Sequence, residues 1–192
     1  ENRVKDQIHL APPNRPVVIR NGVSAKDTTG CDLHENEGYH PERYFWRMEK
    51  RLEKEVETPV WPAGIQLRPF RQSQDERIVF DTLREAFRGQ WGYVEWNYED
   101  WSRRRFAEGF DPGLWVLAWA GEELAGAALG EMRGDDGWIS QLGVGETWRR
   151  QGLGLAILLQ ALGEFQRRGV LRAGLGVDAQ NPTGATRLYL RA

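Results

Sequence analysis

The sequence predicts a mixed α/β (α+β) domain over residues 65–192, in which a mostly antiparallel sheet is flanked by helices. Three strand-like runs follow one another with connections so short that they must form antiparallel hairpins. A strongly apolar helix comes next, and Gly169 stands just after its end, where a left-handed glycine is common. The three strands are predicted at residues 114–120, 123–131 and 138–144, and the helix at 153–168.

The other elements follow from hydrophobic periodicity. Apolar residues three and four apart predict helices, and apolar residues two apart predict strands with one buried face. Ser73 and Asp75 are candidate caps for the first helix of the domain. The helices are expected at 73–87, 98–108 and 183–192, and the strands at 17–19, 44–48, 65–70 and 170–177.

Composition excludes several classes of function. The chain has 192 residues and a net charge of −2, whereas a dedicated nucleic-acid-binding domain normally carries a basic excess. No apolar run approaches the roughly 18–20 residues that span a bilayer. A single cysteine, Cys31, cannot form an internal disulfide, which favours a cytoplasmic location. Three scattered histidines have no zinc-ligand spacing, so we expect no metal, nucleic-acid or membrane partner.

The chain contains an internal similarity at a constant offset of 154 residues. Residues 22–30 match residues 176–184 at five of nine positions. The offset is the size of one domain, which favours a tandem arrangement. We therefore expect residues 1–58 to be the C-terminal remnant of a first repeat plus a linker, and residues 65–192 to be a second repeat that lacks its last strands.

A site for a phosphorylated ligand is predicted where the long helix begins. Glycines at 152 and 154 let a ligand oxygen approach main-chain N–H groups, and a helix N-terminus carries partial positive charge with free donors. Arg149 and Arg150 add full charge. A P-loop is excluded because no lysine follows either glycine. A dinucleotide fingerprint fails as well, because Trp148 or Ile157 stands where it needs a small residue.

The pattern Leu142-x-Val144-x4-Arg149-x-x-Gly152-x-Gly154 resembles the acetyl-CoA motif of the GNAT superfamily of N-acetyltransferases. Asn181-x3-Ala185-x2-Leu188-Tyr189 resembles the second motif of that family. The order of elements from residue 65 is also similar. The resemblance implies a GNAT-like mixed sheet that splays open next to the cofactor helix, with acetyl-CoA as co-substrate.

The resemblance also implies a role for each motif residue. Main-chain groups of Leu142 and Val144 would hold the pantetheine arm, and Asn181 would contact the cofactor. The Tyr189 hydroxyl would protonate the departing thiolate as general acid. The diphosphate would be bound by the amides of Arg149, Arg150, Gln151, Gly152, Leu153 and Gly154.

The sequence does not identify the general base that would deprotonate the amine. Trp138 fills the position where several family members have a glutamate, and an indole cannot accept a proton. Asp136, on the same strand face, and Glu131, on the preceding strand, are the candidates. For each of them the alternative interpretation is a solvated carboxylate of the hairpin, and the pattern favours that alternative. A water chain, or an amine that is already neutral, would also serve.

Two further clusters have alternative interpretations. Residues 103–105 are all arginine and could bind an acidic partner, although such a run is typical of a solvated helix face. Five aromatic residues could line an amine-binding site or form a lid packed on its own core. They are Trp91, Tyr93, Trp96, Tyr98 and Trp101.

Taken together, these residues predict an acetyl-CoA-dependent N-acetyltransferase that transfers an acetyl group directly to a primary amine of a small molecule. The alternatives are a non-catalytic module that binds coenzyme A or scaffolds a second GNAT domain or a homodimer, and a nucleotide-binding regulatory domain. Residues 38–48 resemble the strand that would follow residue 192 in a family member. We therefore expect residues 43–50 to pair beside 170–177 and complete the sheet.

Overall fold

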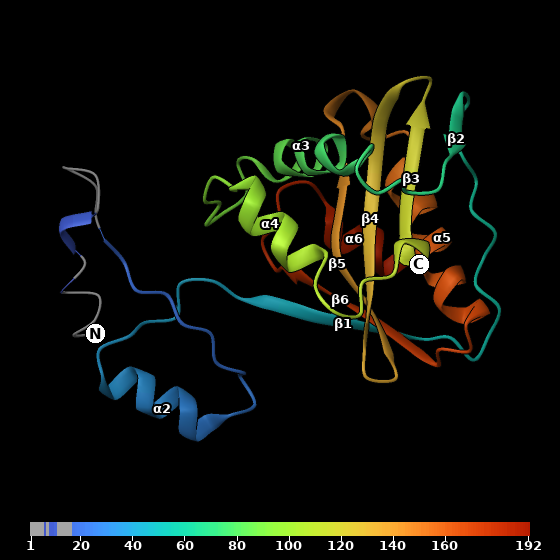
Figure 1. Ribbon diagram of the computed structural model, residues 1–192. Helices are drawn as coiled ribbons and strands as arrows, with labels where there is room; N and C mark the ends of the chain where they lie inside the picture. Colours follow the sequence, from blue (N-terminus) through green and yellow to red (C-terminus); the bar gives the residue numbers. More distant parts are fainter. Residues whose placement is uncertain (1–5, 7, 11–16) are drawn as a thin grey trace. The chain divides into compact units, whose positions relative to one another are not determined.

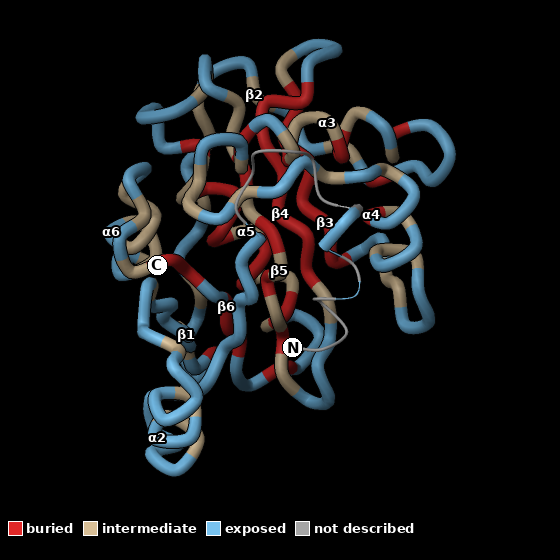
Figure 2. Tube along the Cα trace, turned by 90° about the vertical axis from the view of Figure 1, so that its left-hand side faces the viewer, coloured by how far each residue is buried: buried red, intermediate tan, exposed pale blue. Residues whose placement is uncertain are grey.

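The computed structural model describes residues 6, 8–10 and 17–192, and the chain divides into two compact units between Glu42 and Arg43 (Figure 1). The first unit holds the short helical turn η1 (Ile8–Leu10) and helix α2 (Thr28–Asn36). Asp27 caps α2 by accepting a hydrogen bond from the Gly30 amide at 2.9 Å. Apolar periodicity did not predict α2, which has no buried residue (Figure 2).

The strand expected at residues 17–19 is not formed. These residues are exposed and irregular. A short strand is stable only when a neighbouring strand satisfies its main-chain groups and covers its apolar face. No strand is recorded as pairing with 17–19 within the described residues, so the prediction made from the apolar run alone was wrong.

The second unit is built on a six-stranded sheet in the order β1-β6-β5-β4-β3-β2. Every neighbouring pair is antiparallel except β5 and β6, which are parallel. This arrangement confirms the predicted mixed, mostly antiparallel sheet. The strands are β1 (Phe45–Arg51), β2 (Ile65–Leu67), β3 (Trp115–Ala120), β4 (Glu123–Arg133), β5 (Asp136–Val144) and β6 (Arg172–Asp178).

Helices cover both faces of the sheet (Figure 1). One face packs against α3 and α4, with a core that includes Phe80, Trp101 and Leu129. The other face packs against α5 and α6, with a core that includes Ile157 and Phe165. The buried residues concentrate along the central strands (Figure 2). The helices are α3 (Glu76–Phe87), α4 (Tyr98–Arg105), α5 (Leu153–Arg167) and α6 (Ala185–Arg191), with short turns η2 (Pro112–Leu114) and η3 (Glu146–Trp148).

The sequence located these elements well and their ends less well. Helix α3 begins at Glu76 rather than 73, because Ser73 adopts a left-handed conformation with φ of 66°. The strand expected at 65–70 ends at Leu67, which is followed by Pro69, a residue without an N–H for strand pairing. Among the described residues, no helix is both long and apolar enough to cross a membrane.

Strand β1 completes the sheet from a part of the chain that precedes the domain. Phe45 pairs with Asp178 and Arg51 with Arg172, so all seven residues of β1 lie in antiparallel register with β6. This confirms the expected pairing of residues 43–50 beside 170–177. The Gln166 side chain of α5 then holds the following segment, because its Nε2 donates to the carbonyls of Leu52 and Lys54 at 2.7 Å each.

Candidate functional site

The central strands β5 and β6 diverge in the middle of the sheet. Their parallel pairing covers only Gly137–Ile139 and Ala173–Leu175. Beyond Ile139, β5 continues to Val144 against β4, while β6 continues to Asp178 against β1. The sheet is therefore splayed beside α5, as the sequence resemblance implied.

A β-bulge in β5 accounts for this divergence. The register between β4 and β5 shifts after Leu129, which leaves Ser140 as the extra residue. The Ser140 hydroxyl donates to the Leu129 carbonyl at 3.0 Å and holds the bulge. A bulge bends its strand and increases the local twist, which turns the end of β5 away from β6.

The turn before α5 presents main-chain N–H groups in one region. Arg150 and Gly152 both have positive φ, 61° and 87°, and alternation of this kind forms an anion-binding concavity. The N-cap Gly152 has no side chain to cap the helix. The Gly152 carbonyl accepts hydrogen bonds from Leu155 and Ala156, so the helical ladder begins after the amides of residues 150–154. This geometry suits a phosphate or diphosphate.

The side chains of the turn are directed differently from its amides. The Arg149 guanidinium donates to the Val144 carbonyl at 3.2 Å and to the Ala86 carbonyl, near the end of α3, at 3.5 Å. Gln151 donates to the Thr147 carbonyl at 2.8 Å. These contacts brace the turn against β5 and α3. The Arg150 side chain is exposed, so the main-chain N–H groups and this guanidinium are left to bind an anion.

Helix α6 places Tyr189 on the same side of the sheet as this turn. A Cβ atom on Gly154 would lie 2.9 Å from Leu188 Cδ1, so α6 packs closely on the first turn of α5. Burial raises the pKa of the Tyr189 hydroxyl to about 12. Asn181 organises the loop before α6, because its Oδ1 accepts a hydrogen bond from the Thr183 amide at 2.9 Å.

The two candidate bases lie in different surroundings. Asp136 is at the far end of β5 from Val144 and receives two hydrogen bonds from Arg172, at 3.0 and 2.6 Å. These bonds hold the pKa of the Asp136 carboxyl below its ordinary value. Glu131 pairs in register with Trp138 on the neighbouring strand, closer to the bulge, and is contacted by Arg105 and Arg133.

Arg105 is the functional candidate that the sequence did not predict. The run 103–105 was interpreted as a solvated face, but the Arg105 side chain is mostly buried, and burial lowers its pKa. Its Nη1 donates to Ser140 Oγ at 2.8 Å and to Glu131 at 3.4 Å. Arg105 therefore ties α4 to the bulge and to Glu131. No sequence signal separates it from Arg103, whose side chain is 77% exposed.

Of the five aromatic residues between 91 and 101, two pack in the core. Trp101 is buried and its Nε1 donates to Gln141 Oε1 at 3.1 Å. Tyr98 packs on Phe80 with ring centroids 5.4 Å apart. The packed interpretation therefore holds for these two residues. Trp91 instead lies 6.2 Å from the Phe45 ring of β1, which connects the loop after α3 to the edge of the sheet.

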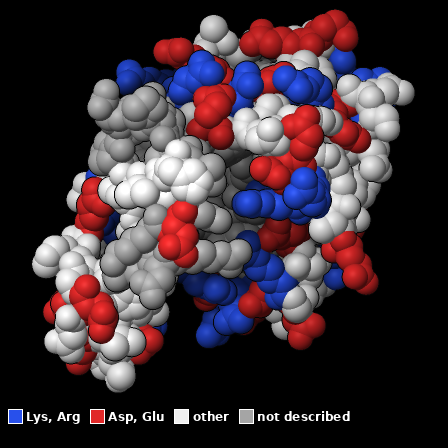
Figure 3. All heavy atoms as spheres, turned by 60° about the vertical axis from the view of Figure 1, so that its left-hand side comes forward, with Lys and Arg blue, Asp and Glu red and all other residues white. Residues whose placement is uncertain are grey.

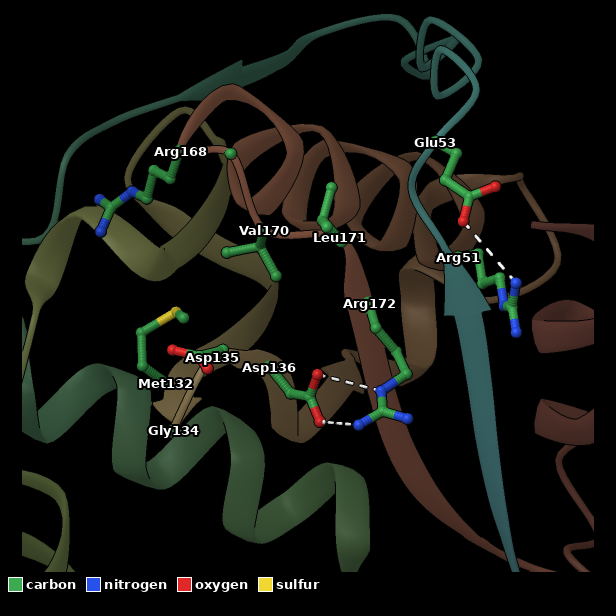
Figure 4. A pocket seen from close by; sticks show the side chains of 11 residues that line it. Arg51, Glu53, Met132, Gly134, Asp135, Asp136, Arg168, Val170, Leu171 and Arg172 are labelled. Atoms are coloured by element: carbon green, nitrogen blue, oxygen red, sulfur yellow. Dashed lines mark hydrogen bonds and ion pairs between the residues drawn. The ribbon is translucent and has the colours of Figure 1, made fainter.

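A cavity of about 680 Å³ lies at the opposite end of the sheet from the splay (Figure 4). Most of its charged side chains are engaged with one another or with neighbours. Arg172 pairs with Asp136, and Arg168 with Glu164 and Asp111. The cavity contains Asp136 and none of the other predicted site residues. The splay, and not this cavity, gathers the candidate site.

The comparisons with known proteins agree with this geometry. A model of the Acetyltransferase (GNAT) family matches residues 78–192. A protein of Thermobispora bispora named mycothiol acetyltransferase is 34% identical over 158 residues, which cover 77% of this chain and 52% of that protein. A protein of the same name from Geodermatophilus obscurus is 30% identical over 171 residues, covering 84% and 55%.

Solved structures extend the similarity to the fold. A GCN5-related N-acetyltransferase from Sphaerobacter thermophilus matches with a TM-score of 0.83 and 36% identity, over 99% of this chain and 60% of that one. The PaiA N-acetyltransferase from Thermoplasma acidophilum, solved with coenzyme A, shares the fold at 19% identity and a TM-score of 0.53, over 67% and 88%. The chain spans about half the length of the curated relatives it matches. On the family match over residues 78–192, the chain belongs to the GNAT family of acetyltransferases.

Proposed function

We propose that this protein transfers an acetyl group from acetyl-CoA to a primary amine of a small molecule by direct attack. The observation that carries the proposal is the splay between β5 and β6 beside the uncapped start of α5. Two diverging strands leave main-chain groups for an extended ligand arm, and the turn supplies N–H donors for its diphosphate. Acetyl-CoA supplies the activated acetyl thioester.

The cofactor side of the site is made mostly of main chain. The ends of β5 at Leu142 and Val144 would hold the pantetheine arm, and Asn181 would contact it from the loop before α6. The amides of residues 149–154 would hold the diphosphate. This assignment fits the observed left-handed conformations at Arg150 and Gly152, which aim consecutive N–H groups to one side.

The acid and base follow from the surroundings of each side chain. Glu131 is our candidate to take the proton from the attacking amine, because it lies beside the bulge where the sheet opens. Asp136 is disfavoured by its position, because it lies at the far end of β5 from Val144 and lines the cavity at the opposite end of the sheet from the splay. Tyr189 would give its proton to the departing thiolate as the carbon–sulfur bond breaks.

The acceptor is proposed only by class. The relatives carry the name mycothiol acetyltransferase. A small-molecule amine that also carries a thiol is therefore the first acceptor to test. Acidic and basic side chains intermingle on the face shown in Figure 3. That surface suits a small acceptor better than a nucleic acid, which requires a basic surface.

We also propose that residues 1–58 are the end of a first repeat, which makes the protein a tandem of GNAT-like domains. The 154-residue offset maps α2 (Thr28–Asn36) onto residues 182–190, which contain most of α6. Asp27 caps α2 through its Oδ1, and its counterpart Asn181 uses its Oδ1 to accept a hydrogen bond from the Thr183 amide in the turn before α6. A cytoplasmic location remains a prediction.

The decisive experiment measures thiol release from acetyl-CoA with a panel of primary amines. We expect amine-dependent release with formation of the N-acetyl product. Coenzyme A should also raise the melting temperature more than ATP or NAD. Binding of coenzyme A without release for any amine would favour the non-catalytic module, and stronger protection by ATP or NAD would favour a nucleotide-binding domain.

Substitution of Gly152 by valine should weaken binding of coenzyme A about tenfold, or about 1.4 kcal/mol. Gly152 has a φ of 87°, which a β-branched residue tolerates poorly, and the new side chain would stand at the N–H groups. Isothermal titration calorimetry measures the change. Gly121→Val is the matched control, because Gly121 has a φ of 59° in a remote hairpin turn. Equal weakening in both variants would contradict the assignment.

Arg105→Ala should lower kcat roughly tenfold with a smaller change in the KM of the amine, because a displaced catalytic group loses its alignment. Arg105 contacts both Glu131 and the bulge residue Ser140. Arg105→Lys should restore part of the activity. Arg103→Ala, on the same helix but exposed, is the control and should leave kcat unchanged. Similar losses in Arg103→Ala and Arg105→Ala would refute a positioning role.

A further inference from the structure

Gly176 is an exposed residue in the interior of a sheet strand. It lies in β6, and its neighbours Leu175 and Val177 are buried. Its φ is outside the left-handed region, so the backbone does not require glycine there. A glycine inside a strand often marks a place where a ligand or another backbone approaches closely.

Packing does not explain this glycine, whereas it does explain Gly174 two residues earlier. A Cβ atom on Gly174 would lie 2.9 Å from Trp138 Cζ3 and 3.0 Å from the Met48 carbonyl oxygen. A Cβ atom on Gly176 would meet nothing nearer than Trp138 Cζ2 at 3.9 Å, an ordinary contact. The fold therefore has room for a side chain at 176 and none at 174.

The surface over Gly176 adjoins the splay. Leu175 is the last β6 residue that pairs with β5, so Gly176 is the first residue past the point where the strands separate. On its other side Gly176 pairs with Arg47 of β1, and residues directly opposite in neighbouring strands project to the same face. The Gly176 patch, made of Gly176, Trp138 and Arg47, thus borders the opening in the sheet.

Arg47 and Trp138 give this patch a defined chemistry. The Arg47 guanidinium lies 5.0 Å from the centre of the Trp138 ring, and Arg133 lies 4.3 Å from it. Arg47 uses Nε to bond Glu49 at 2.5 Å. Within residues 17–192 this is the one hydrogen bond of the Arg47 side chain, which leaves the N–H donors of Nη1 and Nη2 for other oxygen atoms. The patch combines an indole edge that faces Gly176 with guanidinium N–H donors beside it.

We propose that the Gly176 patch binds the acceptor. The part of the acceptor molecule that carries the amine lies over Gly176 and against Trp138. Arg47 binds an oxygen-bearing group, a carboxylate or a hydroxyl, next to the amine. This inference rests on the proposed function and adds the acceptor's position and chemical class. It also gives β1, which precedes the domain in sequence, a direct part in substrate selection.

The test fills the patch without disturbing the fold. Gly176→Val introduces a residue that is favourable in strands and should raise the KM of the amine at least tenfold. Affinity for coenzyme A should stay within twofold and the melting temperature within a few degrees. Gly163→Ala in α5 is the matched control, because a Cβ atom at Gly163 meets nothing within 4 Å. It should leave the kinetics of both substrates unchanged.

The acceptor class is tested with three groups of amines: amino acids, amino sugars and simple alkylamines. The unaltered chain should prefer one of the first two groups over alkylamines. Arg47→Met should lower the ratio of kcat/KM for that group to kcat/KM for alkylamines at least fivefold. A larger loss of kcat/KM for amino acids would mean that Arg47 binds a carboxylate, and a larger loss for amino sugars would mean that it binds a hydroxyl.

A second readout needs no turnover. Saturation-transfer NMR detects binding of the same amines to the protein in the presence of excess coenzyme A. Gly176→Val should abolish the transfer signal. An unchanged KM and an unchanged signal in Gly176→Val, with coenzyme A still bound, would overturn the Gly176 patch alone. Failure of the unaltered chain to bind coenzyme A would overturn the proposed function and this inference with it.

Discussion

Tyr189→Phe is expected to lower kcat by at least a factor of about 100, the lower end of what general acid catalysis contributes. The substitution removes one oxygen atom from a partly buried ring and keeps the packing of α6. The thiolate would then leave without a proton donor. Stopped-flow or steady-state thiol release measures kcat, and the Kd of coenzyme A should change little.

The pH dependence gives a second check on Tyr189. Burial raises the pKa of this phenol to about 12, so the acid form persists well above neutral pH. Activity limited by Tyr189 should therefore show no decline on the basic side below about pH 10. Tyr98→Phe is the control, because that phenol donates to Glu76 of α3 at 2.9 Å and its ring packs on Phe80. Equal kcat in Tyr189→Phe and the unaltered chain would exclude the acid role.

Arg43→Ala is expected to lower the free energy of unfolding by about 3 kcal/mol, the scale for breaking a buried ion pair by removal of one partner. Arg43 precedes β1 and binds Asp178 at the end of β6 through Nε and Nη2, with distances of 2.8–3.0 Å. The Asp178 side chain is only 7% exposed. Without Arg43 its charge would be buried and unpaired. Urea denaturation at pH 7 measures the loss.

Acid should reduce the effect of Arg43→Ala. The hydrogen bonds from Arg43 hold the pKa of Asp178 below its ordinary value. The ion pair therefore contributes stability above the unfolded-state pKa of about 3.9, and that stability is lost as the pH falls through the lower folded-state value. The difference between variant and unaltered chain should be largest near pH 7 and should narrow below pH 4.

Arg51→Ala, at the other end of β1, is the matched control for Arg43→Ala. The Arg51 side chain is 82% exposed and lies 3.7 Å from an exposed Glu53, so its removal should cost less than about 1 kcal/mol. Equal destabilisation by Arg43→Ala and Arg51→Ala would mean that the Asp178 pair does not anchor β1. A difference that does not narrow in acid would mean that Asp178 is not the group responsible.

Local patterns predicted much of the domain because their causes are local. The hairpins around Gly121 and Gly134 follow from short connections, and α5 follows from an apolar period that ends at Gly169. The glycine-rich turn before Leu153 is also predicted locally, because a strand, two glycines and an apolar helix lie within one short stretch. The turn with free main-chain N–H groups before α5 could be predicted for this reason.

Side chains whose partners lie far away in sequence could not be placed in the same way. Asp136 and Glu131 are equivalent carboxylates in the sequence, and only Arg172 of β6 and Arg105 of α4 separate them. The same holds for Val17–Ile19, which had the composition of a strand but no neighbour recorded as pairing with it.

The sequence by itself therefore determined the family, the order of the hairpins and helices, and the turn at Gly152. The tertiary structure decided which carboxylate lies beside the opening and which arginine is buried. It also decided that Gly176 is exposed where its neighbour Gly174 is covered by Trp138. The physical reason is that hydrogen bonding within a turn or helix acts over a few residues, whereas burial and charge pairing depend on the register of the whole sheet.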